Sequence, residues 1–144
     1  MDTAAVILNA PGQIALDRVT LIEPTAADIV VEISHSGIST GTEKLFWSGE
    51  MPPFPGMGYP LVPGYEATGE VVEAGPDSNV PVGARVFVPG ASCYEGAHGL
   101  FGGSARRIVT DSNRVTRIDS GLGASGALLA LAATARHAMA GPDK

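Results

Sequence analysis

A glycine pattern near the end of the chain has a spacing that could support cofactor chemistry. Gly121, Gly123 and Gly126 match G-x-G-x-x-G, which cradles the pyrophosphate of a dinucleotide, and Asp143 lies 20 residues beyond Gly123. The preceding segment 114–118, however, carries two arginines where a central parallel strand would be continuously apolar. No strand follows in this sequence to complete a βαβ unit. We therefore interpret the pattern as a coincidence in a glycine-rich chain.

Side chains that could ligate a metal ion are few. Cys93 is the only cysteine. Neither a disulfide within one chain nor a multi-cysteine zinc site is therefore available. The remaining metal hypothesis uses Glu66, Cys93 and His98.

A proline-rich loop over residues 51–64 carries several large apolar side chains. Its five prolines make it rigid, so it loses little entropy when it becomes ordered. Met51, Phe54, Met57 and Tyr59 either form the wall of a ligand site or pack on the core of their own domain. The sequence leaves both alternatives open.

The candidate residues described above must be positioned by short strands. Apolar and alternating segments predict strands over 3–10, 14–20, 28–34, 66–74, 80–88, 105–110 and 114–118. The sequence also predicts a short helical turn over 39–50 and a glycine-rich loop over 89–104. After Ser120 the pattern changes to an Ala-rich helix that is apolar nearly all round. Such a helix should be buried, with neighbours on more than one side.

Composition and charge narrow the class of protein. The chain has 144 residues, 44% of them hydrophobic and 17% charged, which fits one globular domain. Its 19 glycines and 11 prolines favour a mainly β fold with many turns. The net charge of −6 argues against nucleic-acid binding. We expect a cytoplasmic protein, because the sequence shows neither a leader pattern nor an apolar stretch long enough to be a transmembrane segment.

Five short motifs follow one another in order along nearly the whole chain. They are GISTGTE at 37–43, LVPGYE at 61–66, GEVV at 69–72, VGARV at 82–86 and GGSA at 102–105. Together they resemble the N-terminal signature of the medium-chain dehydrogenase/reductase superfamily. This resemblance implies a mainly β, GroES-like barrel with short helices as a catalytic domain over residues 1–120. It also implies that residues 121–144 form a helix that leads into a Rossmann domain absent from this chain.

Two positions depart from that signature. Ser39 replaces the cysteine that ligates the catalytic zinc, and Tyr65 replaces the histidine of the Gly-His-Glu motif. Neutral hydroxyls are poor zinc ligands beside thiolate and imidazole. The four-cysteine structural zinc lobe of the superfamily is also absent, so we expect no protein-bound zinc.

Without zinc, side chains must position an alcohol and relay its proton. The resemblance places the Tyr65 phenol at the reaction centre, with neighbouring hydroxyls as the relay and a carboxylate that orients the tyrosine. The candidate catalytic residues are Tyr65, Ser39, Thr40, Thr42 and Glu66. Two structural alternatives stay open. Ser39 and Thr40 could cap the short helix through Glu43, and Glu66 could be a salt-bridge partner.

The sequence of residues 36–45 and 47–60 resembles that of one branch of the superfamily. The enzymes of this branch oxidise the 1-hydroxyethyl group of a (bacterio)chlorophyllide to an acetyl group with NAD. A large, flat, apolar ring suits aromatic stacking and thioether contacts. The candidate substrate-binding residues are Trp47, Phe54, Met57, Tyr59 and Phe101. A propionate on the ring would need a local arginine, Arg106 or Arg107. NAD would be held mainly by the absent Rossmann domain, so the fragment alone is expected to be inactive.

Two other functions stay open. A zinc-independent quinone or enone reductase of the same superfamily would reduce a C=C bond, although the hydroxyl-rich segment 39–42 favours alcohol chemistry. A GroES-like binding module without catalysis would leave the Ala-rich helix without burying partners. A homo-oligomer of the full-length form is a further expectation.

Overall fold

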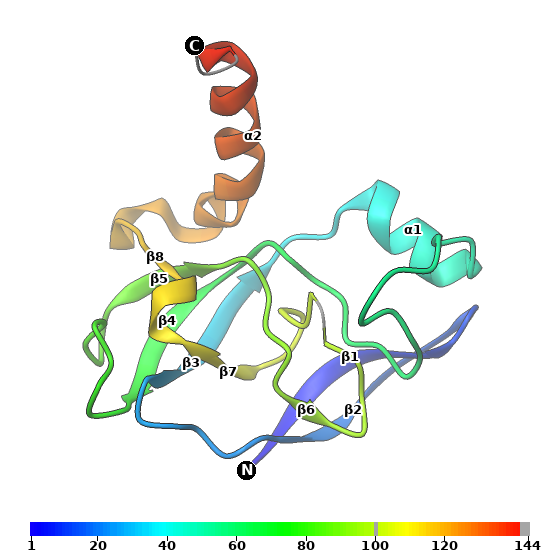
Figure 1. Cartoon of the computed structure of the whole chain (residues 1–144), viewed down its shortest axis with the longest axis horizontal. Coiled ribbons are helices and arrows are strands. Elements are labelled where there is room, and N and C mark those ends of the chain that lie inside the picture. The colour runs from blue at the N-terminus through cyan, green and yellow to red at the C-terminus, as the bar shows by residue number, and fades with distance from the viewer. Residues whose placement is uncertain (100, 142–144) are drawn as a thin grey trace.

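Two antiparallel sheets form the body of the molecule (Figure 1). The computed structural model describes residues 1–99 and 101–141. The smaller sheet has the order β1-β2-β6 and consists of β1 (Asp2–Ala10), β2 (Gln13–Leu21) and β6 (Tyr94–Glu95). The larger sheet has the order β7-β3-β4-β5-β8 and consists of β3 (Asp28–Ser36), β4 (Ala67–Ala74), β5 (Arg85–Val88), β7 (Arg107–Asp111) and β8 (Thr116–Arg117).

The hairpin of β1 and β2 confirms the first two predicted strands. Its two-residue turn is Pro11-Gly12, and Gly12 has a φ of 73°, which glycine adopts without a steric penalty. Ala5 and Ile7 point into the core, while Ile14 and Leu16 of β2 stay exposed. The hairpin therefore has one buried face and one partly apolar outer face.

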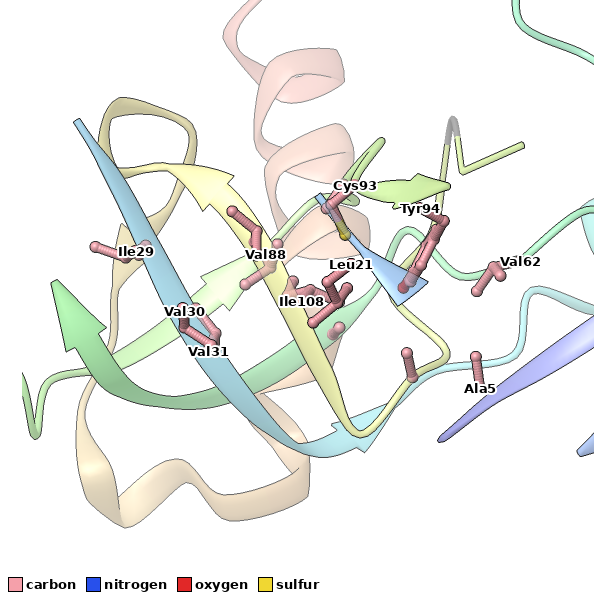
Figure 2. Packing of buried hydrophobic residues seen from close by; sticks show 14 of the residues in the cluster. Ala5, Leu21, Ile29, Val30, Val31, Val62, Val88, Cys93, Tyr94 and Ile108 are labelled. Atoms are coloured by element: carbon pink, nitrogen blue, oxygen red, sulfur yellow. The ribbon is translucent and has the colours of Figure 1, made fainter. Parts of the chain in front are cut away.

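The main core lies between the sheets and draws residues from both (Figure 2). Leu21 comes from the small sheet, and Val31 and Ile108 come from the large one. Cys93 is fully buried in the same cluster, and burial raises the pKa of its thiol. Cys93 is therefore a core residue.

A second, smaller cluster seats the helix α1 (Thr40–Ser48) on the hairpin. Leu8, Phe46 and Leu61 are its buried members. The partly buried residues packed against them are Met51, Phe54, Met57, Tyr59 and Phe101. The loop 51–64 thus packs on a core of its own domain. The Tyr59 hydroxyl donates to the Phe46 carbonyl, which ties the loop to α1.

Several details differ from the predicted elements. The strand expected over 80–88 is reduced to β5, because residues 82–83 form a turn before it. The glycine-rich segment 89–104 contains the short strand β6, which pairs with β2. The strand expected over 114–118 is reduced to β8, because residue 114 belongs to a 3-10 helix, and the strand expected over 105–110 begins at Arg107. The remaining predicted strands and the helical turn are confirmed.

The chain ends in two 3-10 helices, η1 (Ser112–Arg114) and η2 (Ser120–Leu128), and the helix α2 (Leu129–Ala140). The glycine pattern lies in η2, and the preceding strand β8 is antiparallel to β5, so a βαβ unit is not formed there. Asp143, the acidic residue of that pattern, lies outside the described residues. Gly126 and Ala127 are buried beside β4.

The prediction of a buried C-terminal helix is wrong for the described chain. None of the α2 residues is buried, and the helix projects away from both sheets (Figure 1). Leu131 and Met139 are exposed. Within the described part of the chain, no helix is long and apolar enough to cross a membrane.

Candidate functional site

One backbone contact brings two motif segments together. The Gly37 N–H donates to the Glu66 carbonyl at 2.6 Å. A Cβ at position 37 would lie only 2.6 Å from Glu66 Oε2, so a larger residue would displace that carboxylate. The end of β3, the start of α1 and the segment before β4 therefore meet at Glu66.

The predicted hydroxyl relay is partly assembled at this junction. Ser39 occupies the N-cap position of α1, but its side chain makes no capping hydrogen bond. Instead its hydroxyl donates to Thr42 Oγ1 at 3.4 Å. Thr40, the first residue of α1, is exposed. The structure thus brings Ser39 and Thr42 together and leaves Thr40 at the surface.

Two carboxylates lie beside these hydroxyls with unpartnered oxygens. Glu66 is only 5% exposed, and its Oε1 has no hydrogen-bond partner among the described residues. The salt-bridge alternative for Glu66 is therefore not realised there. Glu43 Oε2 is likewise buried without a partner in the described part of the chain.

The environment of Glu43 favours its protonated form. Burial raises the pKa of Glu43, and the charge of Glu66 raises it further, while the backbone amides of Glu43 and Ser39 oppose the shift. From the sequence we considered Glu43 only as a capping partner and did not predict it as a site residue. The available signal was a carboxylate in the first turn of a helix that starts inside a hydroxyl-rich motif.

Tyr65 lies between this junction and the second core cluster. Its half-buried ring meets Phe101 edge-on, with the ring centroids 5.5 Å apart and an interplanar angle of 62°. Phe101 also packs against Phe46 and Phe54. The candidate catalytic tyrosine is therefore held by an aromatic cluster, and Glu66 follows it in the chain.

Two adjoining hollows lie along the outer face of the hairpin, and we call them together the hairpin groove. Both are lined by Val6, Ile38 and Ser104. The first, of about 310 Å³, is further lined by Ala4, Ala5, Leu16, Ser36, Ala105 and Arg106. The second, of about 190 Å³, is further lined by Leu8, Ile14, Glu43, Trp47 and Pro63.

The hairpin groove is apolar with a few polar groups. Ser36 and Ser104 hydrogen-bond to each other through their hydroxyls at 3.0 Å. Glu43 belongs to the second hollow, so the groove adjoins the junction at Glu66. A mostly apolar concavity with a few convergent polar groups and a perturbed titratable residue is typical of a ligand site.

The candidate substrate-binding residues divide into two groups. Trp47 is half-exposed and lines the second hollow. The other four, Phe54, Met57, Tyr59 and Phe101, pack on the second core cluster. Their predicted contact with a ligand stays a prediction.

The two candidate arginines have different surroundings. Arg107 donates to Glu32 Oε2 through Nε at 3.2 Å and Nη2 at 3.0 Å. This hydrogen bonding to Arg107 is the main cause that lowers the pKa of Glu32. Arg106 is 70% exposed, lies 3.5 Å from Glu32 Oε1 and lines the first hollow. Arg106 is therefore the better placed of the two to bind a ligand carboxylate.

The hypothesis of a metal held by Glu66, Cys93 and His98 finds no support in the geometry. Cys93 belongs to the main core, whereas His98 is exposed and lies against Gly58. Across residues 1–99 and 101–141, no three His, Cys, Asp or Glu side chains are grouped as metal ligands would be.

Two curated proteins are similar to this chain over nearly all of its length. Both are named 2-desacetyl-2-hydroxyethyl bacteriochlorophyllide A dehydrogenase. The protein from Cereibacter sphaeroides is 62% identical over 98% of the chain, and the one from Rhodobacter capsulatus is 59% identical over 99%. The chain spans 46% of each relative, so it covers about half of their length.

Solved structures share the fold. One is a candidate zinc-binding dehydrogenase from Sinorhizobium meliloti 1021 with bound NADP, 27% identical, with a TM-score of 0.69. The similarity covers 89% of this chain and 42% of that protein. The family model of the alcohol dehydrogenase GroES-like domain matches residues 25–138. The chain therefore belongs to the alcohol dehydrogenase GroES-like domain family, within the medium-chain dehydrogenase superfamily.

Proposed function

We propose that this chain is the substrate-binding part of a dehydrogenase that oxidises the 1-hydroxyethyl group of a bacteriochlorophyllide-type pigment to an acetyl group. The observation that carries the proposal is its high identity to two dehydrogenases named for that substrate. In this proposal residues 1–120 form the substrate and catalytic domain. Residues 121–144 lead into a nucleotide-binding domain.

The hairpin groove supports a flat, mostly apolar ligand. Its two hollows together fall within the range of about 300–1,000 Å³ that drug-sized ligands occupy. Trp47 offers an aromatic face at one end. Arg106 offers a guanidinium to a propionate at the other.

Oxidation of the alcohol removes a proton from oxygen and a hydride from carbon. A nicotinamide cofactor, which we propose to be NAD, would accept the hydride when bound. The residues of this chain would orient the hydroxyethyl group and receive its proton. In our proposal Tyr65, Ser39 and Thr42 position the alcohol at the junction with Glu66, and no protein-bound zinc takes part.

The direct test incubates the full-length protein with NAD⁺ and the 3-(1-hydroxyethyl) pigment, or with a quinone or an enone of similar size. We expect a pigment product two hydrogens lighter by mass spectrometry, with NADH formed in equal amount. Metal analysis after purification without added metal should find no stoichiometric zinc. Reduction of the quinone or enone in place of pigment oxidation would replace this proposal with the reductase alternative. The cytoplasmic location and the homo-oligomer expected from the sequence stay predictions.

A further inference from the structure

Among the described residues, Glu43 is the one acidic side chain that lines the hairpin groove. The other walls of its hollow come from Val6 and Leu8 of β1, Ile14 of β2 and Pro63, which carry no charge. Ser104 adds a hydroxyl to the same hollow. An apolar setting disfavours the charged form of a carboxyl group, so burial here raises the pKa of Glu43 above its ordinary value.

One oxygen of the half-buried Glu43 side chain is left without a structural partner. Its Oε2 lacks a hydrogen-bond partner among the described residues, and no ion pair holds it there. The Ser39 half of a capping box is missing, because the Ser39 side chain makes no capping bond, while the backbone amides of Glu43 and Ser39 stabilise the charged form of Glu43. Buried polar atoms without partners are costly and uncommon, so each calls for an explanation.

Glu66 is the charged group that acts on Glu43 from the neighbouring segment. It is nearly completely buried, and its own Oε1 is unpartnered among the described residues. Like charges held close together disfavour double ionisation, so the charge of Glu66 favours a proton on Glu43. Glu43 can therefore hold a proton next to the groove.

We propose that Glu43 is the residue that accepts the alcohol proton, with Glu66 positioned to stabilise the protonated pair. This inference rests on the proposed oxidation of a pigment alcohol. The hydroxyl proton passes to a Glu43 carboxylate oxygen as the C–O bond becomes C=O. A bound nicotinamide would accept the hydrogen on the same carbon together with its electron pair and so be reduced. Tyr65 lines neither hollow, so its phenol does not receive the alcohol proton in this scheme.

The test compares Glu43→Gln with wild type in the full-length protein, with Glu50→Gln as the matched control. Glu50 is an exposed residue just beyond α1, and its carboxylate accepts only from Ser48. Because a positioned acid or base contributes about 10²–10⁴-fold, Glu43→Gln should lower kcat by that factor with KM for the pigment little changed. It should also remove the fall in kcat at acidic pH, which Glu50→Gln should retain.

The variant Glu43→Asp distinguishes the loss of the carboxylate from a folding defect. It keeps the carboxylate but withdraws it by one methylene, so kcat should fall less than in Glu43→Gln and the acidic fall should persist. If Glu43→Gln keeps both the wild-type rate and the acidic fall, the inference is overturned while the pigment oxidation stands. If wild type itself does not oxidise the pigment, the proposed function fails, and this inference fails with it.

Discussion

At the scale of single residues, the most unusual feature of the described chain is two carboxyl groups that each have one buried oxygen without a hydrogen-bond partner. Glu43 and Glu66 both have a buried oxygen that makes no hydrogen bond to the described residues. Burying a charge without compensation is costly, and the usual response is a shift of pKa toward the neutral form. Burial raises the pKa of Glu43 in this way.

This shift predicts how stability depends on pH. Because the folded state raises the pKa of Glu43 above its ordinary value, folding favours the protonated form. The contribution of this group is fully present below its ordinary pKa and is lost as the pH rises through the raised value. Glu43→Gln should therefore be more stable than wild type at neutral pH, and the difference should shrink in mild acid. Urea unfolding between about pH 4 and pH 8 measures it, and a difference independent of pH would contradict the assignment.

Tyr65 has a separate prediction. If its phenol positions the alcohol, Tyr65→Phe in the full-length protein should lower kcat by about ten- to a thousand-fold. The acidic fall in kcat should remain, because Glu43 is intact. The ring contact with Phe101 is kept by phenylalanine, so the thermal midpoint should hardly change. Unchanged turnover would remove Tyr65 from the mechanism.

The sequence could predict the hydroxyl cluster but not the carboxylate pair. Ser39 and Thr42 lie within one short motif, so local spacing brings them together. Glu43 and Glu66 are 23 residues apart in the chain, and only the tertiary fold brings the charge of Glu66 close enough to raise the pKa of Glu43. Motif resemblance gave the position of Tyr65 but not its aromatic neighbours. The burial of these carboxylates and of the Tyr65 ring depends on contacts between segments that are distant in the chain. The local sequence pattern therefore cannot predict it.

At the scale of elements, the helix α1 fixes both the junction and one end of the groove. Its consecutive residues Phe46 and Trp47 have opposite surroundings, since Phe46 is 1% exposed and Trp47 is 45% exposed. Phe46 belongs to the second core cluster, and Trp47 lines the groove. The helix therefore packs Phe46 on the core and presents Trp47 to the hairpin groove.

Alanine substitutions at these two neighbours should separate the two roles. Phe46→Ala should cost about 3–5 kcal/mol of stability, because it opens a cavity under α1. This corresponds to a fall in Tm on the order of 10 °C in a domain of this size. Trp47→Ala should cost at most about 1 kcal/mol yet weaken pigment binding. Thermal unfolding of both variants checks this, and equal losses would contradict the seating of α1.

The sequence predicted most strands, since alternation and turn residues carry that signal locally. The hairpin, β3, β4 and the short helix were found where expected. The two-residue strand β6 was missed because its pairing with β2 is long-range and leaves no periodicity. Residues 80–84 were misread as strand because two valines there mimic one, although the chain turns at 82–83.

At the scale of the whole molecule, α2 is an apolar helix that this chain leaves exposed. Its large apolar residues Leu131 and Met139 are both exposed. We propose that the helix packs against a nucleotide-binding domain, in line with the chain spanning about half of its curated relatives. The apolar character of α2 was predicted from the sequence. The exposure of α2 could not be predicted, because it depends on what surrounds the helix.

Leu131→Lys tests this proposal in two contexts. In the 144-residue chain it should leave the thermal midpoint nearly unchanged, because the Leu131 side chain is 56% exposed there. In the full-length protein it should lower the midpoint, because a charge would enter an apolar interface. Equal behaviour in both contexts would contradict the packing of α2.

The central claim is that the hairpin groove holds the pigment, and fluorescence of Trp47 tests it most directly. Trp47 is the only tryptophan and lines the groove. Titration of this chain with a 3-(1-hydroxyethyl) chlorin that carries a propionate should give saturable quenching. Leu16→Gln and Arg106→Gln, both in the groove, should weaken it, whereas Val82→Gln, at an exposed valine outside the groove, should not. Quenching that never saturates, or that Leu16→Gln and Val82→Gln leave equally strong, would contradict the account.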